Sequence, residues 1–230
     1  MSDRAHEDLR SGLMIYDEDA PLPRGGRLSR QERRAQLLEA AQDVFVSSGY
    51  HAAAMDEIAE RAGVSKPVLY QHFPGKMELY LALLDDANDQ LTDTVLSALA
   101  EAPTLAERVV ATIEAYFEFV ARDRTPYRLV FESDLVNDPS VRERLESVEY
   151  AIAEAVAPLM QVNTDFSDAE ARLLATAMVG MAQQSARLWQ EEGRQIPRVH
   201  AARLVAALAF TGVKRLPLTS AEVDDFFIEH

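Results

Sequence analysis

The 230-residue chain contains no cysteine. This excludes disulfide bonds, thiolate zinc sites, iron–sulfur clusters and cysteine nucleophiles, and it is compatible with a reducing compartment. Long apolar runs are missing as well, because the longest near the N-terminus is Leu13–Tyr16, far shorter than the core of a signal peptide or a membrane span. We therefore expect a soluble, cytoplasmic protein that has no membrane partner.

The sequence also lacks the usual patterns of catalytic and metal sites. It has no glycine-rich phosphate loop, and neither Ser185 nor Ser220 is flanked by a glycine elbow. The five histidines share no metal-ligand spacing. Asp85, Asp86 and Asp89 lie close together, but like charges four residues apart on a helix usually mark a solvated face. We expect a protein that is not an enzyme and holds neither a metal nor a cofactor.

What the chain does have is the periodicity of helices. From Arg27 onward, apolar residues recur at intervals of three and four, and no stretch alternates long enough to make a strand. Capping-box spacing at Thr104 and Ser167, and the pair Asp138–Pro139, mark three helix starts. The fold class predicted is all-α. The nine expected helices lie near residues 30–48, 55–62, 66–72, 76–99, 105–122, 126–134, 139–161, 168–192 and 198–211.

Residues 49–73 contain two short helical segments separated by a turn. Gly63 lies where the turn requires a left-handed residue, a conformation that glycine adopts without strain. Ser65 is placed to cap the second helix, and Pro67 lies in its first turn, where a missing amide hydrogen costs nothing. The small Ala59 allows the helices to cross closely. The other residues expected to face the core are Ile58, Val64, Leu69 and Phe73. Together these features predict a helix-turn-helix.

A helix-turn-helix inserts its second helix into the major groove of DNA. The residues expected to bind DNA are Arg33, Ser65, Lys66, Pro67, Val68, Tyr70, Gln71, His72 and Lys76. Gln71 can pair with an adenine edge, Lys66 with guanine or a phosphate, and Val68 or Pro67 can contact a thymine methyl group. The tyrosine, the histidine and the second lysine suit phosphates, which position the protein on the duplex. The alternative is a plain helical corner whose polar residues are only solvated.

The charge of the chain is unevenly distributed. Residues 24–76 contain eight basic and six acidic side chains, a net +2, so the remainder carries −17 of a total of −15. An acidic protein is a poor candidate for DNA binding, because neutralisation of phosphates supplies most of the non-specific affinity. A local cationic surface on an acidic body can still dock a duplex, with the body opposing misplaced encounters. The alternative is that the −17 serves solubility alone.

The stretch from Arg33 to Leu84 resembles the DNA-binding domain of the TetR family of bacterial regulators. The matching residues are Leu37 or Leu38, Ala40, Ala41, Phe45, Gly49, Tyr50, Ile58, Ala59, Ala62, Gly63, Val64, Ser65, Leu69, Tyr70, His72, Phe73, Lys76 and Leu79. One departure concerns the start of the second helix, where the family usually has threonine or serine and this chain has Ala53 and Ala54. We expect this helix start to be weaker and to lack one phosphate contact.

The resemblance implies a homodimer with an operator-binding domain and a ligand-responsive domain in each subunit. It divides the chain into a disordered tail (1–26), a helix-turn-helix DNA-binding domain (27–75), a ligand-binding and dimerisation domain (76–216) and a C-terminal tail (217–230). Three further segments are similar to the actinobacterial TetR-type regulators of fatty-acid synthesis, which respond to long-chain acyl-CoA. They are Asp56–Leu81, Tyr127–Leu135 and Met178–Trp189.

The expected partners are therefore a double-stranded DNA operator, a hydrophobic effector and a second copy of the chain. The residues predicted to line the effector site are Tyr116, Phe117, Leu129, Phe131, Met178, Met181 and Trp189, and those predicted to hold its phosphates are Arg122, Arg124 and Arg128. Bulky apolar side chains line ligand sites, but they also simply fill cores. Surface salt bridges would use the arginines equally well.

A helix–helix seam is expected around Gly180, where small residues allow close approach. Its small residues are Ala177, Gly180, Ala182 and Ala186. The apolar face of the last expected helix could continue the seam with Leu204, Val205, Leu208 and Ala209. The seam belongs either to the dimer interface or to the inside of one subunit. Three other functions stay open: a TetR-type repressor of a transporter or catabolic operon with another hydrophobic effector, an adaptor or ligand-binding protein without DNA binding, and an enzyme acting on acyl-CoA thioesters.

Overall fold

The computed structural model describes residues 28–122, 135, 137–162 and 164–214, and within these ranges the chain has eight helices and no strand. The helices are α1 (Arg30–Ala52), α2 (Met55–Arg61), α3 (Lys66–His72), α4 (Lys76–Glu101), α5 (Leu105–Ala121), α7 (Pro139–Met160), α8 (Asp168–Glu191) and α9 (Arg198–Lys214). The all-α prediction is confirmed, with boundaries within a few residues of those expected. The expected helix over 126–134 and both tails lie outside the described residues.

Local hydrogen bonds explain where several helices begin. Ser29, Thr104 and Ser167 each accept a hydrogen bond from the amide three residues later, and the glutamate at that position bonds back to the capping residue's own amide. These capping boxes satisfy amides that have no partner inside the helix. Asp138 caps α7 by accepting from the amide of Ser140, which lies 2.9 Å from its Oδ1. The predicted starts of α5, α7 and α8 are thus confirmed.

Glycine accounts for the one marked irregularity of α1. The helix continues to Ala52, although the sequence predicted an end at residue 48. The difference arises at Gly49, whose φ of 73° and ψ of 165° break the helix before its last residues. A φ in this range suits glycine because it has no Cβ. The predicted boundary therefore coincides with a kink rather than with the end of α1.

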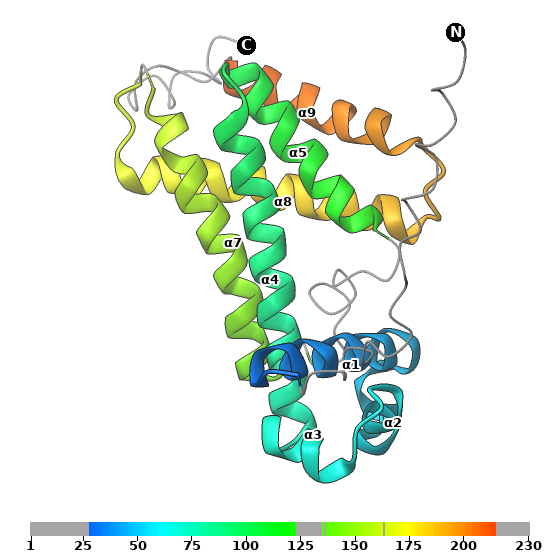
Figure 1. Ribbon diagram of the computed structural model, residues 1–230. Helices are drawn as coiled ribbons and strands as arrows, with labels where there is room; N and C mark the ends of the chain where they lie inside the picture. The colour runs from blue at the N-terminus through cyan, green and yellow to red at the C-terminus, as the bar shows by residue number, and fades with distance from the viewer. Residues whose placement is uncertain (1–27, 123–134, 136, 163, 215–230) are drawn as a thin grey trace, which may run out of the picture.

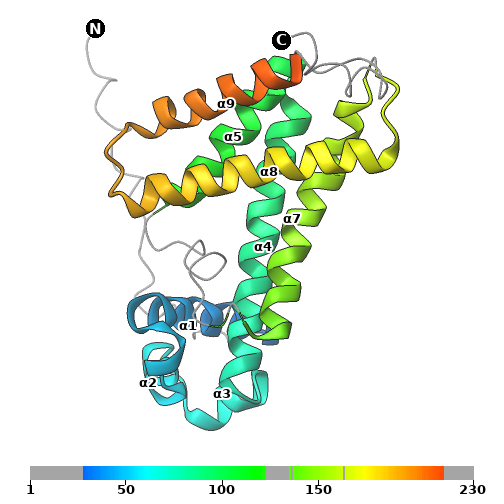
Figure 2. The same cartoon turned by 180° about the vertical axis from the view of Figure 1, so that it is seen from behind.

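Two long helices connect the two ends of the molecule. In Figure 1, α4 and α7 rise side by side from the end that holds α1, α2 and α3, and both start at that end. Figure 2 shows α8 crossing them near the opposite end, with α9 and α5 running beside it. Because each of the two long helices reaches both ends of the molecule, a shift of either helix moves residues at both ends.

The buried side chains form two clusters. The N-terminal core comprises Leu37, Ala41, Val44, Phe45, Met55, Ile58, Leu69, Phe73, Leu79, Tyr80, Leu83, Leu84 and Val141, with further alanines. The C-terminal core is built by α5, α7, α8 and α9 together with Leu91 and Val95 of α4. Thus α4 contributes to both clusters, and α7 joins the N-terminal one through Val141 near its start. None of the helices in the described ranges is both long enough and apolar enough to cross a membrane.

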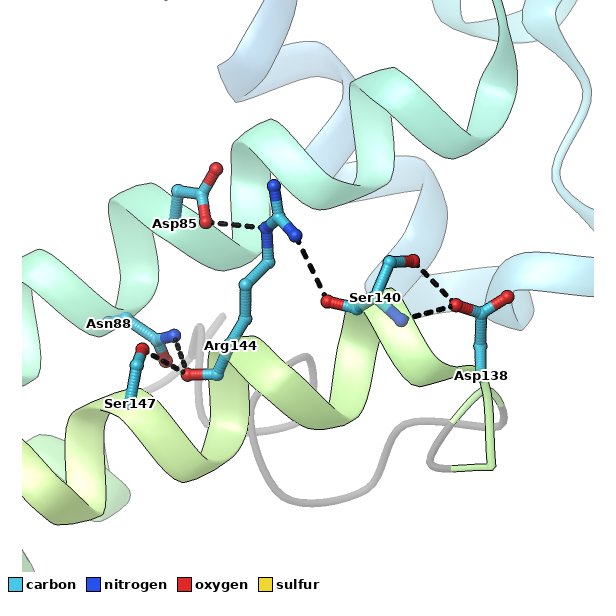
Figure 3. Close-up of polar contacts among 6 residues, drawn as sticks. All are labelled: Asp85, Asn88, Asp138, Ser140, Arg144 and Ser147. Carbon is cyan, nitrogen blue, oxygen red and sulfur yellow. Dashed lines mark hydrogen bonds and ion pairs between the residues drawn. The ribbon is translucent and has the colours of Figure 1, made fainter.

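A polar connection fixes α4 against the first half of α7 (Figure 3). The guanidinium Nε of Arg144 lies 2.7 Å from Oδ1 of Asp85, and its Nη1 donates to the carbonyl of Ser140 at 3.0 Å. Asn88, only 6% exposed, donates its Nδ2 to the carbonyl oxygen of Arg144 at 2.7 Å. Buried polar groups need such partners, so these contacts set the register of the two helices.

Candidate nucleic-acid interface and apolar cavity

The chain between α2 and α3 makes the tight turn that the sequence predicted. Gly63 has a φ of 64°, its amide donates to the carbonyl of Glu60 at 2.9 Å, and the amide of Val64 donates to Ala59 at 3.0 Å. Leu69 is fully buried and Phe73 is 2% exposed. The inner face of α3 is therefore held in the N-terminal core, and its outer face is free to meet a partner.

The outer face of α3 lies at the end of the molecule farthest from α8 and α9 (Figure 1). Lys66, Pro67, Tyr70 and Gln71 are exposed, and Tyr70 retains 46% of its accessible surface. Val68, His72 and Arg33 are half-buried. The ammonium of Lys66 forms an ion pair with Asp56 of α2, and both side chains are more than half exposed. Such a pair is weak in water, so Lys66 can exchange Asp56 for a nucleic-acid group.

A polar groove of about 460 Å³ separates α3 from the start of α1. Its walls are Leu28, Arg30, Arg33, Gly63, Val64, Ser65, Val68, Gln71 and His72. Arg33 donates to Oε1 of Gln36 at 2.7 Å. The guanidinium of Arg34 lies 4.5 Å from the ring centre of Phe73. Arginine is suited to bidentate recognition of phosphate, so this groove is a candidate anion site beside α3.

The pKa of His72 is lowered by its surroundings in this groove. Burial lowers the pKa of its imidazole, and the charges of Arg30, Arg34 and Arg33 lower it further. Both effects disfavour the imidazolium. In the free protein the neutral form is therefore favoured, and a phosphate placed beside it would oppose the arginines and favour protonation.

Lys76 has partners that the sequence did not predict. Its ammonium donates to the backbone carbonyls of Tyr50, His51 and Ala53 at 2.8, 3.2 and 3.0 Å. The same ammonium lies 4.5 Å from the ring centre of Tyr50. The carbonyls at the end of α1 therefore match the three donors of this ammonium in number. The phosphate contact expected of Lys76 would require this ammonium to leave the carbonyls of α1.

Neither α2 nor α3 has a side-chain hydrogen bond that caps its start. Ser65 occupies the N-cap position of α3, but its side chain accepts no capping hydrogen bond, so the hydroxyl cap expected there is wrong. The hydroxyl is exposed and open to a phosphate instead. Ala54 occupies the N-cap of α2 without a side-chain cap, as expected from the missing hydroxyl residue. The start of α2 relies on its backbone and on Asp56 and Glu57 in its first turn.

An apolar cavity lies inside the C-terminal core. It is enclosed by residues of α4, α5, α7 and α8, and its free volume is about 40 Å³. The lining residues are Val95, Leu99, Leu105, Arg108, Val109, Thr112, Ile113, Tyr116, Ile152, Val156, Leu159, Met160, Met178, Val179 and Ala182. Sites for drug-sized ligands measure roughly 300–1,000 Å³. In this state the cavity is too small for such a ligand, so its walls must separate for a large ligand to enter.

Comparison with known proteins identifies the family. A profile described as "Bacterial regulatory proteins, tetR family" matches residues 37–83, and one described as "Tetracyclin repressor-like, C-terminal domain" matches residues 105–212. The HTH-type transcriptional activator FasR of Mycolicibacterium smegmatis is 44% identical over 196 residues, which cover 85% of this chain and 90% of FasR. The chain belongs to the TetR family. It is a TetR-type transcriptional regulator and not an enzyme, as the sequence predicted.

Two solved structures share most of this architecture. A tetR-family regulator from Streptomyces coelicolor is 28% identical, with a TM-score of 0.65 over 81% of this chain and 83% of its own. FadR from Bacillus subtilis, solved in complex with stearoyl-CoA, has the same TM-score of 0.65 at 20% identity over 77% of this chain and 98% of its own. At that identity the likeness to FadR concerns the fold.

The predicted effector-site residues of this TetR-family chain do not line a single cavity. Tyr116 and Met178 line the apolar cavity. Phe117 and Trp189 instead border a second cavity of about 190 Å³ between α8 and α9. Met181 is half-buried against the C-terminal core and borders neither of these two cavities. The other two predicted residues, Leu129 and Phe131, lie outside the described residues, and so do Arg124 and Arg128.

The arginine that lines the cavity is a different one from those predicted. Arg122 ends α5, and its guanidinium lies 5.6 Å from the ring centre of Phe119. It does not line the apolar cavity, whereas Arg108, near the start of α5, does. Arg108 and Thr112 share the apolar face of α5 with Tyr116, at intervals of four residues. In the sequence, Arg108 and Thr112 could have been recognised as lining residues because they are polar side chains spaced four apart on an otherwise apolar stripe.

The predicted seam around Gly180 is divided in the same way. Ala182 and Ala186 are buried inside the subunit, and so is Ala209, whereas nothing lies within 4 Å of a side chain placed at Gly180. The exposed leucines of α8 and α9 are Leu173 (70%), Leu188 (54%), Leu204 (53%) and Leu208 (67%), and Val199 of α9 is exposed as well. The inward part of the seam is intramolecular, and the leucines form a separate exposed surface, named here the α8/α9 leucine face.

Proposed function

We propose that this TetR-family protein is a homodimeric regulator of fatty-acid metabolism genes that binds an operator through α3 and responds to a long-chain acyl-CoA. The observation that carries the proposal is the pairing of an exposed recognition helix with an apolar cavity whose walls include α4. The helix supplies the DNA contact, the cavity supplies the effector site, and α4 belongs to both cores. The four-way division of the chain expected from the resemblance is part of this proposal.

Docking of α3 follows from which of its side chains are free. Gln71 and Lys66 are exposed and able to reach base edges, and Tyr70 is exposed beside them. Arg33 and Ser65 lie on the neighbouring groove, where phosphates of the same strand would pass. Direct contacts to bases select the sequence, and contacts to phosphates fix the position of the protein. The polar side chains of α3 are thus arranged for a duplex and not merely for solvent.

The size and lining of the cavity favour a flexible apolar effector. Of its lining residues, twelve are apolar and three, all on α5, carry polar groups. Methionine adapts to irregular apolar shapes, and Met160 and Met178 lie in the wall. The complex of Bacillus subtilis FadR with stearoyl-CoA supports the proposal, because a protein of this fold holds that ligand.

Entry of a long chain into a 40 Å³ cavity must displace helices. Val95 and Leu99 of α4 line the cavity together with Ile152 and Val156 of α7. Because α4 and α7 are joined at Arg144, a displacement at the cavity is passed down both helices to the N-terminal core. An effector that favours one spacing of the recognition helices changes DNA affinity by its differential affinity for the two states.

The α8/α9 leucine face supports a homodimer. Monomers rarely leave several large apolar side chains exposed on one surface, and a second copy related by a two-fold axis would cover all four. Such an axis places two copies of α3 on a pseudo-palindromic operator. Leu208→Lys is expected to convert the dimer to monomers in sedimentation equilibrium, whereas Tyr150→Lys, on α7, leaves it dimeric. A wild-type protein that sediments as a monomer would contradict the dimer.

The proposed function is tested by fluorescence anisotropy with a labelled duplex from the region upstream of the protein's own gene. We expect binding whose logarithmic affinity falls linearly with the logarithm of salt concentration. Stearoyl-CoA is expected to change this affinity, and coenzyme A without the acyl group is not. Binding without salt dependence would point to an adaptor rather than a regulator that binds an operator. If other hydrophobic compounds changed the operator affinity and acyl-CoA did not, the effector would belong to another class of molecule.

A further inference from the structure

The polar groups of the apolar cavity form a single row. Arg108, Thr112 and Tyr116 are the lining residues with polar side chains, and all three belong to α5. They are four residues apart, so each lies on the same face of the helix, roughly 6 Å further along its axis. The opposite walls are apolar. The cavity therefore has one polar side, which begins with a cation near the start of α5.

The hydroxyl of Thr112 lacks the hydrogen bond to its own helix that the hydroxyls of Thr94 and Thr176 make. The hydroxyls of Thr94 and Thr176 donate to the carbonyls four residues earlier, Gln90 and Arg172, at 2.7 and 2.9 Å. The Oγ1 of Thr112 is buried but has no hydrogen-bond partner among the described residues. A buried hydroxyl without a partner is destabilising, and this one lies on the cavity wall. It is free to donate to a group inside the cavity.

Arg108 leaves part of its hydrogen-bonding capacity unused. Its Nε donates to the carbonyl of Ala102 at 3.0 Å. No carboxylate among the residues described here pairs with its terminal guanidinium nitrogens. Along the cavity wall, a cation is thus followed one turn later by a hydroxyl and then by apolar side chains. A molecule that matches this order has a polar part, then a hydrogen-bond acceptor, then a hydrocarbon chain.

We propose that Thr112 donates a hydrogen bond to the acyl carbonyl oxygen of the effector and so fixes how deeply the chain enters. This inference rests on the proposed function, because a long-chain acyl-CoA carries a carbonyl where its hydrocarbon chain meets its polar part. The hydrocarbon then lies against the apolar walls, including Ile152 and Met178. The pantetheine arm, with the phosphates beyond it, lies on the side of Arg108. Thr112 thereby makes the protein bind an acyl thioester more tightly than an equally long ligand that lacks the carbonyl.

A thermodynamic cycle tests the carbonyl contact directly. Stearoyl-CoA is compared with S-octadecyl-CoA, in which a methylene replaces the carbonyl, on the wild type and on Thr112→Val, by isothermal titration calorimetry. Valine keeps the shape of threonine and removes only the hydroxyl. We expect the wild type to bind the thioester about 5- to 10-fold more tightly than the thioether, the factor typical of one neutral hydrogen bond, and Thr112→Val to bind both equally.

Matched variants separate this role from a structural one. Thr94→Val removes a hydroxyl that already bonds to its own helix, and it is expected to keep the wild-type preference for the thioester. Thr112→Val is expected to melt at or above the wild-type temperature, because the hydroxyl has no protein partner to lose.

The outcomes distinguish this inference from the proposed function. If the wild type binds thioester and thioether equally, or if Thr112→Val keeps the preference, the carbonyl contact is wrong while the acyl-CoA effector stands. If the wild type binds neither compound, the effector class is wrong, and the carbonyl contact fails with it.

Discussion

Replacement of Lys76 by methionine separates two roles for this residue, a structural one at the end of α1 and a contact to a DNA phosphate. Methionine keeps the apolar stem and removes only the ammonium, which donates to three backbone carbonyls in the structure. The structure favours the first role, because three backbone carbonyls already accept hydrogen bonds from this ammonium. The expected consequence is a loss of stability that precedes any effect on DNA.

The magnitude follows from the contacts. A hydrogen bond to a charged donor contributes about 1.5–3 kcal/mol when it stands alone, and a cation at the C-terminus of a helix contributes roughly 0.3–2 kcal/mol. The three carbonyls share a single charge, and the lysine is half-buried, so these contributions overlap instead of adding. We expect Lys76→Met to lower the free energy of unfolding by about 2 kcal/mol, which shifts the urea midpoint by about 1 M at a typical m-value.

Lys66→Met is the matched control, since it makes the same chemical change on the neighbouring helix. The ion pair of Lys66 with Asp56 is exposed, so its loss is expected to cost less than about 1 kcal/mol. In operator titrations Lys66→Met is expected to reduce the slope of log K against log salt by about 1.8, the loss of one phosphate contact in each of the two subunits.

Urea denaturation at fixed protein concentration and anisotropy titrations at several salt concentrations measure both effects. The reasoning is refuted if Lys76→Met unfolds at the wild-type urea concentration and instead reduces the salt dependence of operator binding. That result would mean that the ammonium leaves the carbonyls of α1 for a phosphate, at no cost to the fold.

Three further predictions concern the helix-turn-helix and its surroundings. Gly63→Ala is expected to destabilise the protein by roughly 1–2 kcal/mol, because alanine is strained at a φ of 64°; Gly212→Ala, on α9 and equally free of clashes, should not destabilise it in the same urea assay. Tyr70→Ala should weaken all operators similarly, whereas Gln71→Ala should change which bases are preferred in a binding selection, and the reverse pattern would contradict the contacts assigned here. The lowered pKa of His72 in the free protein, set by burial and by the arginines of α1, predicts proton uptake when a phosphate approaches. Operator affinity should therefore rise as the pH falls below the pKa of His72 in the DNA complex, and a wild-type pH profile identical to that of His72→Gln would exclude this role.

Much of the fold could be predicted because its signals are local. The capping boxes at Thr104 and Ser167 involve residues three apart, and the turn at Gly63 depends on the conformation of a single residue. The outward and inward sides of α3 followed from the four-residue spacing of Leu69 and Phe73. Each of these features is decided within one or two helical turns, so each is written in consecutive residues.

The sites depended on contacts between distant segments. Tyr116 and Phe117 are adjacent in sequence, yet one lines the apolar cavity and the other borders the cavity between α8 and α9. Neighbours on a helix are about 100° apart, and periodicity alone does not tell which flanking helix each meets. Lys76 illustrates the same limit, because its carbonyl partners lie 23 to 26 residues earlier in the chain.

The sequence by itself determined where the helices lie, which side of each is apolar, and that two of them form a helix-turn-helix. Only the tertiary structure decided that Ala182 and Ala186 pack inside the subunit while Leu204 and Leu208 stay exposed. It also decided that Thr112, polar on an apolar stripe, lies on the wall of a cavity. The physical reason is that helix formation depends on neighbours along the chain, whereas burial and cavities depend on which helices are brought together by the packing of the whole molecule.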